Sequence, residues 1–555
     1  MLYGKIRSAV LLLCLIPVFM FAQEDVLKLV QYDGNANTFV NAQIIADTTA
    51  TGGLLPNRVY ELDRDGFYLV NATLRMAQPG ETLRLRAASG DGPLPIIYLW
   101  QTGEGDNPER PPGYFIRAQG GNLELTEIAV AGYYEPIAAN LDNIQGGLFR
   151  NDLAGSSFFF DGCIFSNING QILRTNQNTI TVSVTNCIFS NLGSLTTSNL
   201  GAGKGLDLRD KECVNLIVEN NTFVNYQDRV IRHYNFGDPT AGTGLIHSGR
   251  INHNTIINGM GYHGLFSLGS VGAEMTITNN LFVDGFGLGE DSTDASRAAE
   301  WANTGEVYEN GNNKISWIFS SPNDVTSWDI SNNYFAISAA GQTFLDDFSF
   351  GPAAQLSDHI SGKLGSGAAT AFTKIDMDLV EIPAMMTDFM RWYEDPNGGN
   401  KSKDTDNYNS ATDDMDRRVI TYYRDTLDAS YSTSSAAYTG GSDGLPVGDL
   451  NWFGLVTAID EDISDKRPIH FTLGQNYPNP FNPSTKITFS VTKNERVVLE
   501  VFNIVGQKVA TLINKKLGSG QYTASWNATN YSSGLYFYRL TQGPISSTKK
   551  MILVK

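Results

Sequence analysis

Short apolar runs alternate with asparagine-rich turns through the middle of the chain. Six of these runs share one pattern, with Asn or Cys at the third position and Phe or Ile at the fifth. They are DGCIFSN (161–167), TNCIFSN (185–191), ENNTFVN (219–225), NHNTIIN (252–258), TNNLFVD (278–284) and SNNYFAI (331–337). The third positions are separated by 24, 34, 33, 26 and 53 residues, as expected for a short constant core joined by loops of variable length.

A repeat of this kind predicts a solenoid of short parallel strands, in which equivalent residues stack about 4.8 Å apart. Asn at a turn tolerates the left-handed backbone conformation and can bond to the next coil. The pattern resembles the right-handed parallel β-helix of the pectate lyase superfamily, including its asparagine ladder. A β-sandwich with asparagine-rich turns is the alternative. The β-helix predicts that Phe165, Phe189, Phe223 and Phe282 form one interior row and that Cys163 and Cys187 lie on adjacent coils.

Earlier β-rich segments fit the same tube, which we expect to run continuously from about residue 26 to 454. Residues 285–326 are predicted to be an insertion with a short helix near 295–303. A partly helical extension is expected near 340–450. It contains a helical stretch at 375–394, interrupted at Pro383, and the segment GGSDGLPVGDLNWF (440–453). This last segment resembles the closing segment of pectate-lyase-like surface proteins from Bacteroidota-type bacteria.

The N-terminus has the pattern of a secretory signal peptide. Lys5 and Arg7 precede an apolar run at residues 9–20, and Ala22 offers a small residue at the cleavage site. The run is short for a membrane anchor, and no other segment is apolar enough to cross a membrane. We therefore expect an exported mature chain that begins near Gln23 and has no transmembrane segment.

The amino-acid composition changes after the acidic linker DEDISDKRP. The segment LGQNYPNPFNPSTKITFSV (473–491) and the following strands alternate apolar and polar residues between glycine-bearing turns, as in a small β-sandwich. This region resembles the type A C-terminal sorting domain of the type IX secretion system, with an Ig-like sandwich fold. The resemblance implies a partner, the secretion machinery, and delivery to the outer-membrane surface or the medium. The expected all-β organisation is a signal peptide (1–22), a right-handed parallel β-helix (23–455), a linker (456–467) and a sorting domain (468–555).

Composition supports export. The chain has 555 residues, a net charge of −18, only 18% charged residues and 55 glycines, a balance that favours a β-rich exported protein. The acidity, without a basic stripe, argues against nucleic acid as a partner. Removal of the signal peptide leaves Cys163, Cys187 and Cys213, an odd number, and no CxxC or Cys/His cluster predicts a zinc site.

Positive charge is concentrated in one three-coil region. Aligning the strands that follow the repeats places Arg174 and Arg232 in one column, with the rung GKGLDLRDKE (203–212) between them. We predict that Arg174, Lys204, Arg229 and Arg232 converge on an exposed groove. Ordinary salt bridges between adjacent coils are the alternative interpretation.

Polysaccharide lyases of the resembled fold cleave uronic-acid chains by β-elimination. The reaction needs a cation to neutralise the sugar carboxylate and a base, usually Lys or Arg in these families, and often uses calcium. The resemblance therefore implies three sets of candidates. They are Lys204, Arg232, Arg229 and Arg174 for catalysis, Arg209, His233 and His263 for substrate binding, and Asp207, Asp210 and Glu212 for a calcium ion.

A polygalacturonase-like hydrolase is a further alternative. Asp207, Asp228 and His263 follow the order of that family's residues, but Arg229 and Tyr262 depart from its pattern. The acidic loop at 404–416 is a weak candidate for calcium. The sequence thus predicts a secreted or surface β-helix protein that acts on or binds an acidic polysaccharide, with a non-catalytic binding or adhesive protein as the main competing hypothesis.

Overall fold

The computed structural model describes most of the chain after the signal peptide, in two compact units, Met1–Trp452 and Phe453–Lys555. The described residues are 24–103, 111–132, 146–193, 203–233, 244–261, 265–287, 314–320, 326–347, 354–383, 427–455, 472–474, 476, 479–491, 495–504, 507–517, 520–542 and 545–555.

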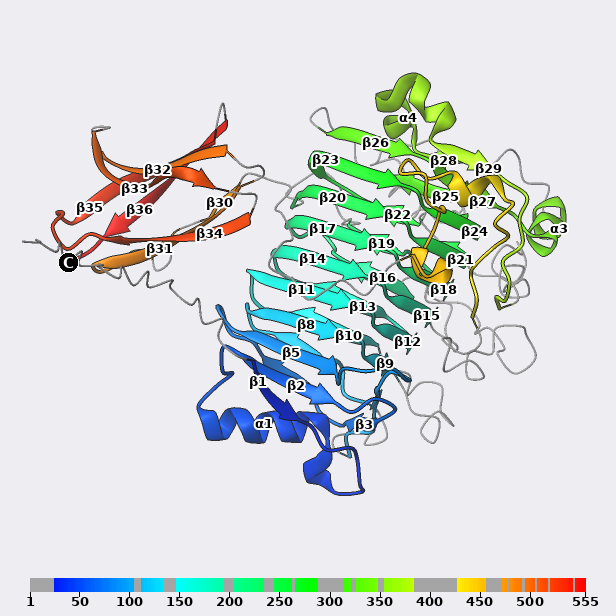
Figure 1. Ribbon diagram of the computed structural model, residues 1–555, viewed down its shortest axis with the longest axis horizontal. Helices are drawn as coiled ribbons and strands as arrows, with labels where there is room; N and C mark the ends of the chain where they lie inside the picture. Colours follow the sequence, from blue (N-terminus) through cyan, green and yellow to red (C-terminus); the bar gives the residue numbers. More distant parts are fainter. Residues whose placement is uncertain are drawn as a thin grey trace, which may run out of the picture. The chain divides into compact units, whose positions relative to one another are not determined.

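The first unit is a parallel β-helix with three strands in each full coil, stacked into three ladders (Figure 1). The first ladder contains β1 (Asp25–Lys28), β2 (Arg58–Leu62), β5 (Thr82–Ala87), β8 (Asn122–Thr126), β11 (Ser156–Asp161), β14 (Thr179–Thr185), β17 (Cys213–Glu219), β20 (Ile246–Asn252), β23 (Val271–Thr278) and β26 (Ser327–Ser331). The second contains β3 (Phe67–Val70), β6 (Ile96–Leu99), β9 (Ala129–Ala131), β12 (Ile164–Ile168), β15 (Ile188–Leu192), β18 (Thr222–Tyr226), β21 (Thr255–Gly261), β24 (Leu281–Gly287), β27 (Asn333–Ala336) and β29 (Phe372–Lys374). The third contains β4 (Leu74–Met76), β7 (Ile116–Ala118), β10 (Gly147–Asn151), β13 (Gln171–Thr175), β16 (Lys204–Asp207), β19 (Ile231–Arg232), β22 (Phe266–Ser267), β25 (Lys314–Phe319) and β28 (Ala354–Leu356).

The second ladder carries the predicted aromatic column. Phe165 pairs with Phe189 and Phe189 with Phe223, and the column continues through Ile256 to Phe282. All five side chains are buried, and the rings of Phe189 and Phe223 stack with centroids 4.5 Å apart. The predicted interior row is therefore confirmed.

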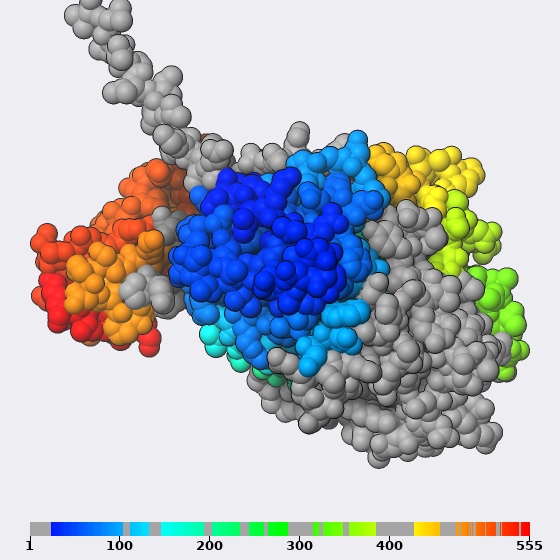
Figure 2. Space-filling view, turned by 90° about the horizontal axis from the view of Figure 1, so that it is seen from below, coloured from blue at the N-terminus to red at the C-terminus, as the bar shows by residue number. Residues whose placement is uncertain are grey.

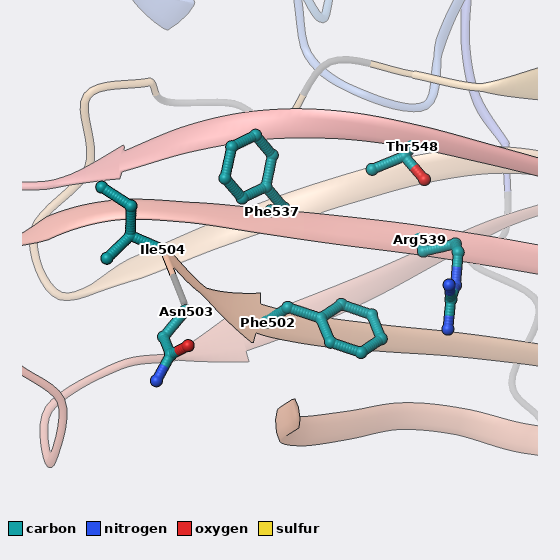
Figure 3. Close-up of a pocket in the computed structure, with 6 residues that line it drawn as sticks. All are labelled: Phe502, Asn503, Ile504, Phe537, Arg539 and Thr548. Atoms are coloured by element: carbon teal, nitrogen blue, oxygen red, sulfur yellow. The ribbon is translucent and has the colours of Figure 1, made fainter. Parts of the chain in front are cut away.

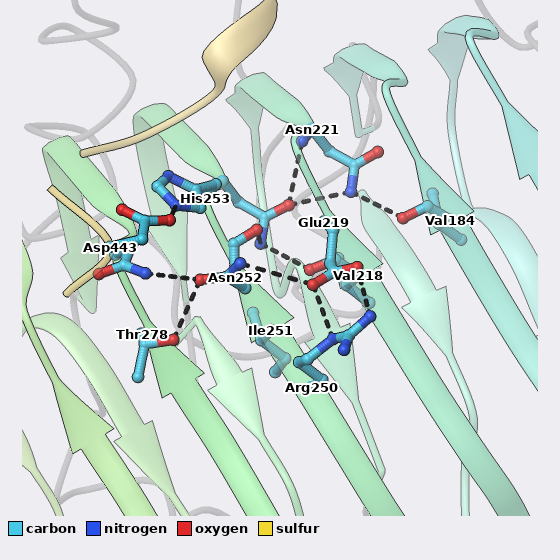
Figure 4. A network of polar contacts seen from close by, with 12 residues as sticks. Val184, Val218, Glu219, Asn221, Arg250, Ile251, Asn252, His253, Thr278 and Asp443 are labelled. Carbon is cyan, nitrogen blue, oxygen red and sulfur yellow. Dashed lines mark hydrogen bonds and ion pairs between the residues drawn. The ribbon is translucent and has the colours of Figure 1, made fainter. Parts of the chain in front are cut away.

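The third position of each repeat forms a hydrogen-bonded column at the turn into the second ladder. The side-chain nitrogen of Asn221 donates to the side-chain oxygen of Asn254, that of Asn254 to Asn280 and that of Asn280 to Asn333, each at 2.9 Å. The side chain of Asn221 also donates to the carbonyl of Val184 (Figure 4). These buried amides satisfy backbone groups that the turn would otherwise leave unpaired.

Cysteine takes the place of asparagine at the start of this column. The backbone N–H of Cys163 faces the sulfur of Cys187 at 3.4 Å, and that of Cys187 donates to Asn221 at 2.9 Å. The two cysteines lie on adjacent coils, as predicted. Cys163, Cys187 and Cys213 are all buried free thiols.

Helix α1 (Val40–Thr51) was not predicted, because the tube was expected to be strand from residue 26. Its residues Val40 and Ile44 are buried and belong to the same core as the strands. The helix ends at Gly52, whose φ of 78° provides the left-handed C-cap. N-terminal residues cover this end of the tube (Figure 2), so α1 closes the interior that an open first coil would expose.

Short helices lie at the last coils. They are α3 (Ala339–Asp347), α4 (Asp358–Leu364) and the 3₁₀ segment Gly365–Thr370. Ile360 of α4 is buried in the core of the tube. Residues 375–383 form no helix, so this part of the helical stretch predicted at 375–394 is wrong, and residues 384–394 lie outside the described residues.

Among the described residues, the last strand of the ladders is β29, so the prediction of one continuous tube to residue 454 is wrong for residues 427–452. Residues 427–452, here called the strap, instead lie against the turn before the second ladder. Asp443 contacts His253 at 2.9 Å, Asn451 donates to Asn186 and to the carbonyl of Asn220, and Asn332 donates to Gly440. The strap thereby ties several coils together.

The insertion predicted at 285–326 overlaps the end of β24 and contains β25, which is a strand of the third ladder. Gly287 and Phe286 pair with Lys314 and Ile315 in an antiparallel bridge that interrupts the parallel order. Residues 288–313, including the short helix expected near 295–303, lie outside the described residues.

The second unit contains two antiparallel sheets. One holds β30 (Thr472–Leu473), β31 (Ser484–Val491) and β34 (Gly520–Asn527), and the other holds β33 (Lys508–Leu517), β32 (Glu495–Asn503), β35 (Gly534–Gln542) and β36 (Ile545–Leu553). Buried residues of both sheets, including Ile487, Trp526, Leu499 and Tyr538, form one core that is separate from the core of the tube. The predicted small sandwich is confirmed in this form.

Candidate functional site: an arginine column on the third ladder

Arginine recurs at one outward position of the third ladder. Arg75 pairs with Arg117, Arg117 with Arg150, and Arg150 with Arg174. The next coil places Asp207 beside Arg174, and the one after places Arg232 beside Asp207. The neighbouring apolar residues point inward, so the strand alternation turns these guanidinium groups away from the core. We call the five arginines the arginine column.

Sequence reasoning found two members of this column and missed three. Arg174 and Arg232 share it as predicted, with one coil between them. The missed members are Arg75, Arg117 and Arg150. The signal was present, because every arginine of the column directly follows a core residue in a short strand. These pairs are Leu74-Arg75, Ile116-Arg117, Phe149-Arg150, Leu173-Arg174 and Ile231-Arg232.

One carboxylate serves the first three arginines. Asp152 lies 2.7 Å from Arg117, 3.1 Å from Arg150 and 3.4 Å from Arg75. Burial alone would raise the pKa of Asp152, but hydrogen bonds from Arg117 and Gln119 and the charge of Arg150 outweigh it and hold the pKa low. Among the described residues, these three cations share the one carboxylate of Asp152, which leaves excess positive charge on this part of the face.

Asp207 is the second carboxylate of the column. It contacts Arg232 at 2.9 Å and Arg174 at 4.0 Å. Its burial would raise its pKa, yet the charges of Arg232, Lys204 and Arg174 hold the pKa below its usual value. Burial, and then the charge of Arg174, lower the pKa of the half-buried Arg209. Cations are therefore crowded around Asp207, and Arg174 keeps 30% of its side chain exposed.

Lys204 and Arg229 do not reach this face. Lys204 forms a buried ion pair with Asp228 at 2.9 Å, and Arg229 contacts the same carboxylate at 3.2 Å. The side chains of Lys204 and Arg229 are only 4% and 1% exposed. Burial also lowers the pKa of Lys204. The prediction of one exposed groove lined by Arg174, Lys204, Arg229 and Arg232 is wrong for Lys204 and Arg229. Arg232 is also buried, with 10% of its side chain exposed, because it packs against Asp207.

The histidine candidates divide in the same way. His233 is fully buried, and its ring nitrogens contact the carbonyls of Leu268 and Lys211, each at 2.8 Å. Burial lowers its pKa, against the two backbone carbonyls, which favour the protonated ring. Both ring nitrogens face backbone carbonyls inside the fold, so His233 bridges two turns and does not face a ligand. His263 lies outside the described residues.

The predicted calcium ligands are each engaged by a different side chain. Asp207 contacts Arg232, Asp210 contacts Lys211 at 3.2 Å, and Glu212 contacts His247 at 2.8 Å. Among the described residues, no group of three His, Cys, Asp or Glu side chains is placed to hold a metal ion. These three residues do not fit a calcium site. The loop at 404–416 lies outside the described residues, so calcium there stays a prediction.

Comparison with known proteins concerns the second unit. Residues 475–555 match the family model of the secretion system C-terminal sorting domain. No curated protein matches the chain. In the part of the chain that the structure describes, no helix is long and apolar enough to span a membrane. The chain is thus a type IX secretion cargo, a parallel β-helix exported to the cell surface or the extracellular space by its C-terminal sorting domain.

Proposed function

We propose that the β-helix binds an acidic polysaccharide along the arginine column. The observation that carries this proposal is one column with arginine on four successive rungs, Asp207 on the next and Arg232 on the sixth; among the described residues, Asp152 and Asp207 are the carboxylates that pair with it. Isolated surface ion pairs contribute little to stability. A column of aligned arginines with excess positive charge is therefore not explained by the stability of the fold.

The chemistry of the column suits uronic-acid chains. Guanidinium groups form paired hydrogen bonds with carboxylates, and Arg holds its charge at any physiological pH. The rungs repeat about every 4.8 Å, so the column presents cations at regular intervals to a polymer that carries regularly spaced carboxylates. Several weak contacts on one chain add up, because each contact after the first is intramolecular.

Binding is better supported than cleavage. β-Elimination requires a base that reaches the proton beside the sugar carboxylate. Lys204 and Arg229, two of the candidates for that role, are buried and paired with Asp228. Arg174 keeps 30% of its side chain exposed and is suited to neutralising a carboxylate, whereas Arg232 is buried against Asp207. We therefore favour a non-catalytic binding or adhesive protein over a lyase, and a lyase over a hydrolase.

The test compares Arg150→Gln/Arg174→Gln with a control pair that removes equal charge from the first ladder, Arg84→Gln/Arg250→Gln. The control arginines are also ion-paired, with Glu124 and Glu219. Calorimetric titration of the mature chain with polygalacturonate, alginate and a neutral glucan should show binding of the acidic polymers alone. The column variant should bind at least about tenfold more weakly, a change of about 1.4 kcal/mol, and the control should bind like the unmodified protein.

Product analysis in the same samples separates the competing functions. An unsaturated product that absorbs in the near ultraviolet would identify a lyase, and new reducing ends alone would identify a hydrolase. Equal weakening in both variants would show a general charge effect and overturn the assignment to the third ladder.

A further inference from the structure

Charge is divided very unevenly between the sorting domain and the rest of the chain. Residues 475–555 contain ten of the 40 Lys and Arg residues but only two of the 58 Asp and Glu residues, Glu495 and Glu500, which gives a net charge of +8. The rest of the chain therefore carries −26. A domain this basic on an acidic protein indicates a dedicated interaction with a polyanion.

The positive charge gathers on the outer face of one sheet. On β32, Val497, Leu499 and Val501 are buried, so Arg496, Glu500 and Phe502 alternate with them on the outer face. The strand partners on that face add further cations. These partners are Lys516 opposite Arg496, Lys508 opposite Phe502, Arg539 opposite Glu500 and Lys550 opposite Phe537. Glu500, the carboxylate of this face, contacts Lys508 and Arg539 at 2.9 and 3.7 Å. We call this surface the basic face.

Apolar side chains lie among the cations. Phe502, Ile504, Phe537 and Arg539 line a shallow hollow of about 290 Å³, with Arg539 lying 4.7 Å from the centre of the Phe502 ring (Figure 3). Ile504 is 70% exposed. Ile552, which pairs with Leu535 at the same end of the sheet, is 41% exposed. Exposed aliphatic and aromatic side chains surrounded by Lys and Arg form a surface that is both cationic and partly apolar.

We propose that the basic face of the sorting domain docks on an anionic lipid surface. Phosphate headgroups would neutralise the cations, while Ile504, Ile552 and the ring of Phe537 would enter the boundary between headgroups and acyl chains. Basic residues near an anionic leaflet each contribute attraction, and apolar residues add to it. Charge complementarity selects this occupant over a neutral one.

The full-length protein without its signal peptide is co-sedimented with two kinds of vesicle. One contains phosphatidylcholine alone, and in the other roughly a third of the lipid is phosphatidylglycerol. Binding should require the anionic lipid. Lys508→Gln/Lys550→Gln should weaken it about 25-fold, or about fivefold for each cation removed. The charge-matched control Lys486→Gln/Lys374→Gln, with one lysine on the other sheet and one on the tube, should bind normally. Ile504→Asn should weaken binding to vesicles without changing the charge.

Three results would overturn the proposal. Binding without phosphatidylglycerol, equal losses in the two lysine pairs, or full binding by a chain that ends at residue 467 would each do so. Normal vesicle binding by the basic-face variants combined with failed surface delivery in cells would instead indicate a protein partner at this face. The arginine-column variants should bind vesicles normally, so this test and the polysaccharide test fail independently.

Discussion

At the scale of single residues, the environment rather than the residue type decides the role of each cation near Asp207. Arg174 and Lys204 lie on neighbouring coils, yet Arg174 is partly exposed while Lys204 is buried against Asp228. The repeat predicted which residues share a column because the side chains of a strand alternate strictly. It did not predict the burial of Arg229 in the turn before β19, because the path of a turn depends on packing that has no period in the sequence. Lys204 lies on β16, and its burial depends on the same turn, which brings Asp228 to it.

Lys204 tests the structural role of the buried pair. Lys204→Met leaves Asp228 without its closest cation, so we expect the free energy of unfolding of the tube to fall by about 3–5 kcal/mol. The double variant Lys204→Met/Asp228→Asn should lose at least as much stability, since it also removes the carboxylate that the buried Arg229 contacts at 3.2 Å. Denaturant unfolding followed by tryptophan fluorescence measures both. If the Lys204 variant keeps full stability but loses polysaccharide binding or cleavage, Lys204 has a functional role and the structural interpretation is wrong.

At the scale of elements, the ladders were predictable and the pieces that close them were not. The Asn or Cys column and the Phe or Ile column recur in six coils, so six short motifs fixed the register of that part of the second ladder. Helix α1 and the strap each occur once, and only their packing against the tube explains them. The strap contributes a buried carboxylate, Asp449, which accepts a hydrogen bond from Thr222 at 2.8 Å.

Asp449 should make the attachment of the strap sensitive to pH. Burial raises its pKa from 3.8 to about 7, against the hydrogen bonds from Asn451 and Thr222. Between pH 3.8 and about pH 7, Asp449 is protonated in the folded chain and ionised in the unfolded chain. The free energy of unfolding should therefore fall as pH rises from about 4 to about 7, by up to about 4 kcal/mol, and then level off.

Asp449→Asn removes this titration and should flatten the pH profile of thermal unfolding between pH 5 and pH 8. The control is Asp443→Asn on the same strap. Burial would raise the pKa of Asp443, but the hydrogen bond to His253 holds it low, so its loss should not flatten the profile in that range. An unchanged slope in Asp449→Asn would contradict the assignment.

At the scale of the whole molecule, the chain has two units with separate cores, the β-helix and the sorting domain that directs its export. The sorting domain was predictable because its strands and motifs follow a family pattern along its whole length. The ligand of the tube was not, because a register of arginines specifies charge and spacing but not the identity of a sugar.

Ending the chain at residue 467 should leave the tube folded but retained in the periplasm, because no core residue of the tube comes from the deleted part. Cell fractionation and protease accessibility of the truncated protein measure this. The full-length Arg150→Gln/Arg174→Gln variant should reach the surface normally. Surface delivery of the truncated chain would show that another segment directs export.

The arginine column also has an evolutionary consequence. Among the described strands, each internal strand of the tube pairs with the equivalent strands of the coils on either side, so a duplicated coil can extend the ladders without changing the pairing of distant coils. Every duplication of a coil that carries Arg would lengthen the column by one cation, whereas substitutions would adjust single positions. Descendants of this gene can therefore match longer or shorter polymers by changing the number of coils between the two capped ends.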